Sequence, residues 1–337
     1  MIRVGFLGAG LIATYHSKSL RRCGETITWT GVYDPDGQRA EAFAQASGAS
    51  VCGSEDEVLD TCDAVYVCTW TSEHRRLVEA AASRGLAVFS EKPLAPTLSD
   101  ARAMAECVAN AGVVNQVGLV LRRSPAFTML REITHDPKAG RIMSVVFRDD
   151  QYIPTQGAYG STWRGDVARA GAGTLLEHSI HDIDLLEWVI GPIASVTARA
   201  ASFHEIAGIE DVAVATVGFT SGAIGSLVSV WHDILARPSL RRVEVFCERT
   251  WAAVEGDWFG PVTWTQADGT HGKLEGDDLL DAARQVSGEV PNADGAFIRA
   301  ARTGEAAFPD FAVAVRAHEV ADAMYRSAAA DGAPIRT

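Results

Sequence analysis

Short apolar runs alternate with helix-like segments through the first third of the chain. Residues 2–7 form an apolar run of the kind found in strands that are buried on both faces. Similar runs predict strands at 27–33, 64–68, 86–89 and 113–121, and the segments between them predict helices at 11–23, 38–47, 72–85 and 98–110. Because each strand is followed by a segment of helical length, the pattern predicts a doubly wound parallel sheet.

The pattern changes near residue 124. After a helix at 125–134, long strand-like runs follow one another at 142–152, 193–203, 212–219, 223–231, 242–247 and 262–266. A Thr-Ser-Gly turn at 220–222 joins two of these runs as a hairpin. One helix near 175–189 interrupts the strands and a last helix is expected at 311–328. Strands joined directly in this way predict a largely antiparallel second sheet.

Composition excludes several classes of protein. A length of 337 residues suggests about two domains, and 47% apolar with 22% charged residues is not the composition of a disordered chain. The formal net charge of -13 argues against a nucleic-acid partner. No apolar run reaches the ~18 residues of a membrane span. Six cysteines without a C-x-x-C pair are typical of reduced thiols, so we expect a cytoplasmic protein.

A G-x-G-x-x-A motif follows the first predicted strand. Gly8 permits the tight turn, Gly10 lets the backbone approach a diphosphate, and Ala13 allows the helix to pack closely on the strand. The intervening residues, Leu11 and Ile12, place their backbone N–H groups at the helix N-terminus. A glycine turn without any ligand is the alternative, but the strand before the motif and the helix after it favour a dinucleotide site.

An acid ends the second predicted strand. Asp34 is placed to accept hydrogen bonds from the adenosine ribose hydroxyls and would repel a 2'-phosphate. The next residues, Pro35-Asp36-Gly37, supply no cation for a phosphate, which favours NAD over NADP. Arg39 is close enough in sequence to keep NADP as the lesser alternative.

A lysine follows the predicted strand at 86–89. Ligands of parallel sheets bind at the carboxyl ends of the strands, which is where Lys92 lies in the Glu91-Lys92-Pro93 triplet. A lysine there can donate a hydrogen bond to a hydroxyl or carbonyl oxygen and stabilise developing negative charge. The alternative is a solvated surface lysine beside Glu91.

The segment from Gly171 to Asp184 holds the densest polar cluster of the chain. On one continuous helix, Glu177, His181 and Asp184 share a face, whereas His178 projects about 100° away. His181 is suited to exchanging a proton near neutral pH, and Glu177 can orient it or bind a substrate hydroxyl. A polar helix face at a domain boundary is one alternative. A metal site is another, but the spacing matches no zinc signature, so we expect no metal.

Three of these motifs together resemble the glucose-fructose oxidoreductase / inositol dehydrogenase (Gfo/Idh/MocA) family, and the resemblance covers nearly the whole chain. They are the glycine motif, the Glu91-Lys92-Pro93 triplet and the segment from Glu177 to Asp184. The resemblance implies a Rossmann domain at residues 1–122, then an α+β domain with an open, mostly antiparallel sheet at 123–337. It also implies a cis Lys92-Pro93 peptide, with Lys92 beside the nicotinamide and the substrate.

Further site residues follow from the resemblance. His181 matches the family's catalytic histidine, Glu177 takes the place of a usual aspartate, and Asp184 matches the final aspartate. The loop after the strand at 64–68 is similar to a family cofactor loop, with Trp70 replacing a proline and Thr71 an asparagine. The remaining expected contacts are Thr69, Trp70, His74 and Glu91 for the cofactor, and Arg122, Trp163, Arg164 and His178 for the substrate. Salt bridges are the alternative for Arg122 and its neighbour Arg123. Contact with a neighbouring strand is the alternative for His178, and a plain helix-start position is the alternative for His74.

The predicted function is that of an NAD-dependent oxidoreductase acting on a secondary alcohol of a sugar, an inositol or a related polyol. Lys92 would bind the reacting oxygen, His181 would act as general base, and Glu177 would orient His181 or a neighbouring hydroxyl. Two alternatives stay open: a non-redox enzyme with retained NAD, like the family's glycosidases, and a dinucleotide-binding regulator. The resemblance also implies pairing through the open sheet face, and so a homodimer or homotetramer. The strands of that sheet contain apolar residues whose face the sequence leaves open: Val212, Val214, Ile224, Val228 and Val230.

Overall fold

The computed structural model covers residues 1–337 and describes all of them except 158 and 289–291. Two compact units can be distinguished within it. Unit 1 comprises residues Met1–Leu119, Ala168–Gly171 and Asn292–Arg316, and unit 2 comprises Val120–Val167, Ala172–Pro291 and Ala317–Thr337. The main segment of unit 1 ends close to the predicted boundary at residue 122. The predicted division at residue 122 placed the two shorter segments of unit 1, Ala168–Gly171 and Asn292–Arg316, in the second domain.

Unit 1 is built on a six-stranded parallel sheet, as the strand and helix alternation predicts. Its strand order is β3-β2-β1-β4-β5-β6. The strands are β1 (Ile2–Leu7), β2 (Ile27–Tyr33), β3 (Ser50–Val51), β4 (Ala64–Val67), β5 (Ala87–Ser90) and β6 (Asn115–Val117). β6 is shorter than the predicted strand at 113–121, and residues Val120–Arg123 form a 3-10 turn instead.

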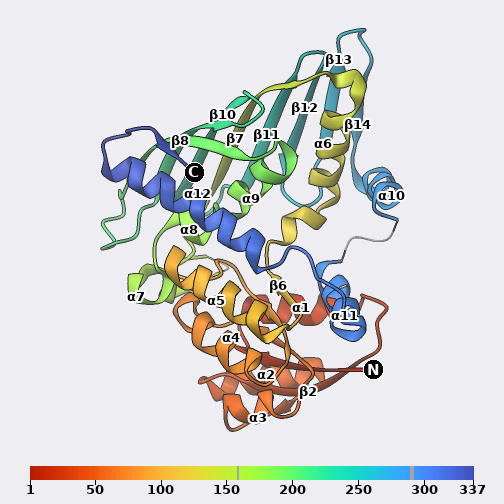
Figure 1. Ribbon diagram of the computed structural model, residues 1–337, viewed down its shortest axis with the longest axis vertical. Helices are drawn as coiled ribbons and strands as arrows, with labels where there is room; N and C mark the ends of the chain where they lie inside the picture. The colour runs from red at the N-terminus through yellow and green to blue at the C-terminus, as the bar shows by residue number, and fades with distance from the viewer. Residues whose placement is uncertain (158, 289–291) are drawn as a thin grey trace. The chain divides into compact units, whose positions relative to one another are not determined.

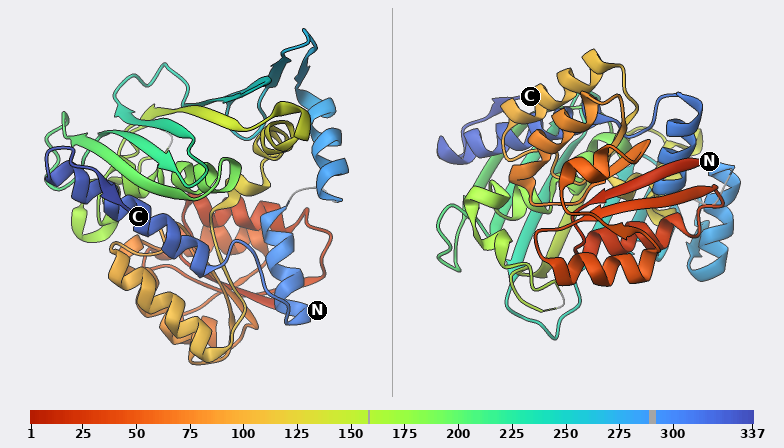
Figure 2. Two further views of the ribbon diagram at one scale, coloured as in Figure 1. Left: turned by 45° about the horizontal axis from the view of Figure 1, so that its top comes forward. Right: turned by 90° about the horizontal axis from the view of Figure 1, so that it is seen from below.

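Helices cover both faces of this sheet, and in the right-hand view of Figure 2 the red strands lie between two helical layers. They are α1 (Leu11–Leu20), α2 (Gly37–Ser47), α3 (Glu55–Leu59), α4 (His74–Ala82), α5 (Leu98–Ala111) and α11 (Ala293–Thr303). α4 packs beside α5, and α1 packs beside α11. Thr97 caps α5 by accepting a hydrogen bond from the Asp100 N–H.

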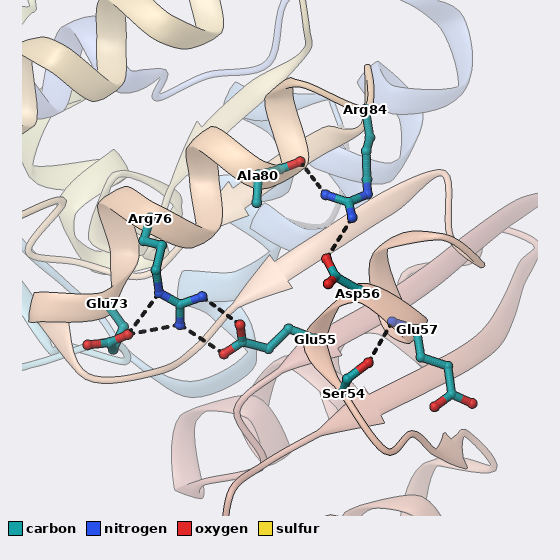
Figure 3. A network of polar contacts seen from close by, with 8 residues as sticks. All are labelled: Ser54, Glu55, Asp56, Glu57, Glu73, Arg76, Ala80 and Arg84. Atoms are coloured by element: carbon teal, nitrogen blue, oxygen red, sulfur yellow. Dashed lines mark hydrogen bonds and ion pairs between the residues drawn. The ribbon is translucent and has the colours of Figure 1, made fainter.

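Charged side chains link α3 to α4 on the surface of unit 1 (Figure 3). Arg76 of α4 pairs with Glu55 of α3 at 2.6 Å, and Arg84 pairs with Asp56 at the same distance. Ser54 caps α3 by accepting from the Glu57 N–H. Since the two arginines are partly exposed, each pair contributes about 0–1 kcal/mol. The network therefore connects α3 to α4 and contributes little to the stability of unit 1.

Unit 2 contains a nine-stranded sheet in the order β14-β13-β12-β11-β7-β10-β9-β8-β15. Every neighbouring pair is antiparallel except β7 and β10, which run parallel. The strands are β7 (Ile142–Tyr152), β8 (Ile193–Ala201), β9 (Val212–Phe219), β10 (Ile224–His232), β11 (Leu240–Cys247), β12 (Thr250–Gly256), β13 (Val262–Gln266), β14 (His271–Leu274) and β15 (Ile335–Arg336). The Thr-Ser-Gly turn joins β9 to β10 as predicted, with Gly222 at a φ of +88°.

One face of this sheet carries the core of unit 2. Val145 and Phe147 of β7 are buried, and they pack against α6 (Pro125–His135) and α9 (Ile180–Val189), which Figure 1 shows along the sheet. The other helices of the unit are α8 (Thr174–Glu177) and α10 (Gly276–Ser287). Helix α7 (Val167–Ala170) begins in unit 2 and continues in unit 1, and α12 (Phe311–Ala329) begins in unit 1 and continues in unit 2.

The predicted single helix at 175–189 is wrong, because the chain breaks between α8 and α9. Buried hydroxyl groups bind the flanks of this break to β10. The Ser229 hydroxyl on β10 lies 2.7 Å from the hydroxyl of Thr174 and 2.6 Å from that of Ser179. Glu177 therefore ends one helix while His181 belongs to the next, so the two side chains do not share one continuous helical face.

Among the residues that the structure describes, no helix has both the length and the apolar character needed to cross a membrane.

Candidate functional site

The turn between β1 and α1 has the geometry of a diphosphate cradle. Gly8 has a φ of +91°, and a Cβ atom at this position would lie 2.4 Å from the Cys68 carbonyl oxygen, so only glycine fits. A Cβ atom at Gly10 would meet no atom within 4 Å, which leaves the approach to this backbone open. Ala13 is fully buried, as close packing of α1 on β1 requires.

The first turn of α1 offers backbone donors to an anion. The side chains of Leu11 and Ile12 are exposed, and the turn contains no acidic residue. The first N–H groups of any helix lack intrahelical acceptors and carry the positive end of the helix dipole. The residues present therefore fit the diphosphate of a dinucleotide.

Asp34 joins the loop after β2 to this cradle. One carboxylate oxygen accepts from the Ala9 N–H at 2.8 Å, and the other accepts from the Asp36 N–H at 2.9 Å. These two bonds fix the orientation of the carboxylate beside the glycine turn. Asp34 is thus placed where an adenosine ribose is bound in sheets of this type. Arg39 lies nearby in α2, but its side chain pairs with Asp36 at 3.3 Å.

The loop after β4 holds three of the predicted cofactor residues. His74 begins α4 and is buried, with Nδ1 3.1 Å from the Pro93 carbonyl and Nε2 3.3 Å from the Thr69 carbonyl. It therefore ties this loop to the segment that follows β5. The ring of Trp70 lies against the Arg169 guanidinium, whose Cζ is 4.0 Å from the ring centroid.

The Glu91-Lys92-Pro93 triplet begins directly after β5. The Lys92-Pro93 peptide is cis, as the family resemblance implies. Glu91 is buried and donates its backbone N–H to the Val67 carbonyl at 2.9 Å. Its Oε1 atom lies 2.8 Å from the Nε2 atom of His16 in α1, a partner that the sequence interpretation missed. The triplet is thus anchored at the carboxyl ends of β4 and β5, where ligands of parallel sheets bind.

In unit 2, Glu177 forms an ion pair with Arg164. The carboxylate is buried and accepts from the Arg164 Nε–H at 2.9 Å. The Arg164 guanidinium lies over the ring of Trp163, with Cζ 4.3 Å from the ring centroid. This contact joins two predicted sets of residues, the Glu177 segment and the Trp163-Arg164 loop, and the charge of Arg164 offsets that of Glu177.

His178 faces a buried ionic network. Its Nε2 atom lies 2.7 Å from the Asp149 carboxylate and 2.8 Å from the Arg241 guanidinium. Arg241 also pairs with Asp182 at 2.8 Å. Burial first, and then the charge of Asp149, raises the pKa of Asp182 to about 7. His178 thus contacts neighbouring strands, but its partners Asp149 and Arg241 were not predicted, because these strands are far from α9 in sequence.

Arg122 makes a bidentate salt bridge with Asp184 of α9. Both Asp184 oxygens accept from the guanidinium, at distances of 2.6 to 3.0 Å, and Asp184 is buried. This is the salt-bridge alternative for Arg122. His181 lies in the first turn of the same helix with 8% of its surface exposed.

A doubly wound sheet with this glycine turn and this acid defines a dinucleotide-binding protein. Comparison with known families makes the assignment more specific. Residues 2–119 match the model of an oxidoreductase family with an NAD-binding Rossmann fold, and residues 127–253 match the GFO/IDH/MocA C-terminal domain. The chain belongs to this Gfo/Idh/MocA family of NAD-binding oxidoreductases, as the three motifs predict.

Curated relatives agree with this assignment, and solved structures share the fold. The chain is 32% identical to 1,5-anhydro-D-fructose reductase of Ensifer adhaerens over 69% of each chain. It is also 32% identical to scyllo-inositol 2-dehydrogenase (NAD(+)) of Bacillus subtilis over 70% of each chain. An oxidoreductase domain protein from Kribbella flavida has the same fold, with a TM-score of 0.87, 24% identity and coverage of 100% and 99% of the two chains. A levoglucosan dehydrogenase in complex with NADH aligns with a TM-score of 0.86 at 19% identity, over 99% of this chain and 98% of that one.

Proposed function

We propose that this oxidoreductase uses NAD to oxidise a secondary alcohol of a sugar, an inositol or a related polyol. The single observation that carries the proposal is the anchored Lys92 triplet, at the same sheet edge as the Asp34-bound glycine turn. The relatives named above are dehydrogenases and a reductase of such compounds, and they lend no support to a glycosidase-like or regulatory function.

Different residues would bind different parts of the dinucleotide. The turn formed by Gly8, Gly10, Leu11, Ile12 and Ala13 would bind the diphosphate, and Asp34 would bind the adenosine ribose hydroxyls. A bound NAD supplies the acceptor for the hydride that leaves the alcohol carbon.

The loop residues support this site in different ways. The buried ring of His74 would hold the loop of Thr69 and Trp70 against the segment after β5. Glu91 would fix the backbone that carries Lys92. We therefore assign His74 and Glu91 to positioning, and Thr69 and Trp70 to the cofactor surface.

Two side chains would act on the reacting hydroxyl. Lys92 would donate a hydrogen bond to its oxygen and stabilise the negative charge that develops there. His181 would take the hydroxyl proton as a general base, because an imidazole exchanges protons near neutral pH. Glu177 would keep Arg164 and Trp163 in place, so that they bind the remaining hydroxyls of the substrate. We assign Arg122 and His178 to holding the fold around α9, since both are ion-paired within unit 2.

Formation of NADH tests the proposal. Purified protein is supplied with NAD and a panel of inositols, anhydro sugars, aldoses and sugar acids, and a parallel set receives NADP. We expect steady NADH formation from at least one cyclic polyol or sugar, with NAD preferred. A protein that binds NADH tightly but oxidises no member of a broad panel would contradict the proposed reaction.

We also infer a homo-oligomer, a homodimer or homotetramer, that works in the cytoplasm. Three apolar residues are exposed on neighbouring strands of the second sheet. Val214 of β9, Ile224 of β10 and Val146 of β7 are 44%, 61% and 46% exposed, respectively. In register, Val228 is paired with Val214, and Val230 with Val212, so the apolar residues line one face. The six cysteines are free thiols, which supports a reducing compartment.

A further inference from the structure

His16 lies buried between two carboxylates that come from distant parts of unit 1. Its Nδ1 atom is 2.7 Å from the Oδ1 atom of Asp294 in α11, and its Nε2 atom is 2.8 Å from the Oε1 atom of Glu91. The three residues are 5%, 4% and 6% exposed, respectively. The contacts therefore form one enclosed chain of hydrogen bonds from α11 through α1 to the end of β5.

The charges within this chain favour a protonated imidazole. Burial alone would lower the pKa of His16, but the charges and hydrogen bonds of Asp294 and Glu91 outweigh burial and raise it to about 10. Burial alone would likewise raise the pKa of Glu91, yet the contact with His16 brings it below its ordinary value. At neutral pH, both ring N–H groups of His16 therefore donate, one to each carboxylate.

Glu91 connects His16 to the backbone of Lys92. While its Oε1 atom faces His16, its Oε2 atom accepts the backbone N–H of Lys92 at 3.1 Å. The backbone at Gly118 encloses the carboxylate, since a Cβ atom there would lie 2.4 Å from Oε1. Because both oxygens have partners and little space surrounds them, the carboxylate is held in one orientation.

A tie between helices is the simpler interpretation of His16, because α1 also packs against α11. That interpretation explains the contact with Asp294. It does not explain why the second ring nitrogen faces the carboxylate that binds the Lys92 N–H. The hydrogen bonds extend beyond the α1–α11 pair, through the Glu91 carboxylate, to the backbone N–H of Lys92.

We propose that His16 and Asp294 are positioning residues for Lys92, acting through the two oxygens of Glu91. The inference rests on the proposed function, in which Lys92 binds the reacting oxygen. It adds two residues, one in the first helix and one near residue 300, that neither the glycine motif nor the Lys92 triplet includes. A displacement of about 1 Å in a catalytic group costs about a hundredfold in rate, so this restraint matters for turnover.

Hydrogen exchange of the full-length protein tests the positioning step without substrate. The variants are His16→Gln and the milder Asp294→Asn, and Asp277→Asn in the exposed first turn of α10 serves as the control. Overlapping peptides report the Lys92 amide separately. We expect it to exchange about tenfold faster in His16→Gln and less so in Asp294→Asn, since an amide whose acceptor carboxylate is no longer held in one orientation opens more readily. Unchanged exchange at Lys92 in both variants would overturn the proposal, as would a rise spread evenly over α1 and α11.

A double-mutant cycle links the restraint to catalysis. With the panel member that is oxidised fastest, we expect His16→Gln to lower kcat about tenfold or more, with the KM for NAD within about threefold of wild type. Combined with Lys92→Met, it should cause no further loss, because both changes act through one side chain. A full additional loss in the double variant would contradict action through Lys92. If Lys92→Met alone keeps wild-type turnover, the proposed function fails instead, and the exchange result still decides the positioning step.

Discussion

At the scale of single residues, positions next to the end of a strand are easier to predict from the sequence than contacts between distant segments. Gly8, Gly10 and Asp34 each lie within three residues of the end of a strand, so local spacing is enough to predict their placement. His16 and Asp294 were missed because their contact joins residues 278 positions apart. One local signal existed: His16 follows the buried Ala13 by three residues on α1, which places a histidine on the buried side of that helix.

The first prediction concerns cofactor choice at Asp34. Asp34→Asn keeps an oxygen that can accept from the Ala9 N–H, but it removes the charge that binds ribose hydroxyls and repels a 2'-phosphate. A hydrogen bond to a charged group contributes about 1.5–3 kcal/mol, so we expect the KM for NAD to rise about tenfold or more. The KM for NADP should fall in the same variant. Steady-state kinetics with both cofactors check this, and equal changes in both KM values would contradict a role at the ribose.

At the scale of elements, the sequence pattern predicts β1, β2, β7, β9 and β13 with the bounds that the structure shows. It misses β12, whose central Ala252-Ala253 pair lacks the branched side chains that mark a strand. It also merges α8 with α9, at a point where the Ser179 hydroxyl contacts Ser229 of a strand distant in sequence. The interruption between α8 and α9 lies close to His181, the predicted catalytic histidine.

The second prediction concerns the buried ionic network of Asp182 in α9, Asp149 in β7 and Arg241 in β11. Burial and the charge of Asp149 raise the pKa of Asp182 from 3.8 to about 7, while Arg241 and His178 partly oppose the shift. In the pH range between these values, the native state binds more protons at Asp182 than the unfolded state does. This group therefore lowers the free energy of unfolding as pH rises through that range.

Asp182→Asn removes this titration while keeping the size of the side chain. Measured by urea unfolding, the stability of the variant relative to wild type should increase between about pH 4 and pH 7 and level off above it. Asp277→Asn is a suitable control, since that carboxylate is exposed in α10. A constant difference across the pH range would show that Asp182 does not carry a raised pKa.

At the scale of the whole molecule, both fold classes predicted from the sequence are confirmed: the doubly wound parallel sheet and the mostly antiparallel second sheet. The assignment of residues 292–316 to unit 1 was not predictable from local pattern. Their place depends on contacts such as the Gln116 side-chain bond to the Ala293 carbonyl, at 3.0 Å. Global organisation thus follows from strand and helix alternation, whereas the return of a late segment to an early unit does not.

The third prediction concerns assembly through the exposed face of the second sheet. Val214→Asp places a charge among the apolar residues of β9 and β10, which would be costly if that face were covered by a second copy. We expect light scattering with size-exclusion chromatography to show an oligomer for wild type and a smaller species for the variant. Val286→Asp on α10 is the matched control, because Val286 is 45% exposed and Val214 is 44% exposed. A monomeric wild-type protein would contradict the inference.

The most direct test of the account is NADH formation by three proteins, the wild type, Lys92→Ala and His181→Ala, with the panel member that is oxidised fastest. General acid-base groups contribute about 10²–10⁴-fold, so each variant should lose at least a hundredfold in kcat. Both should still bind NADH with nearly wild-type affinity, measured by fluorescence. If each variant turned over at the wild-type rate, Lys92 and His181 would not be the groups that act on the alcohol, and the proposed mechanism would be wrong.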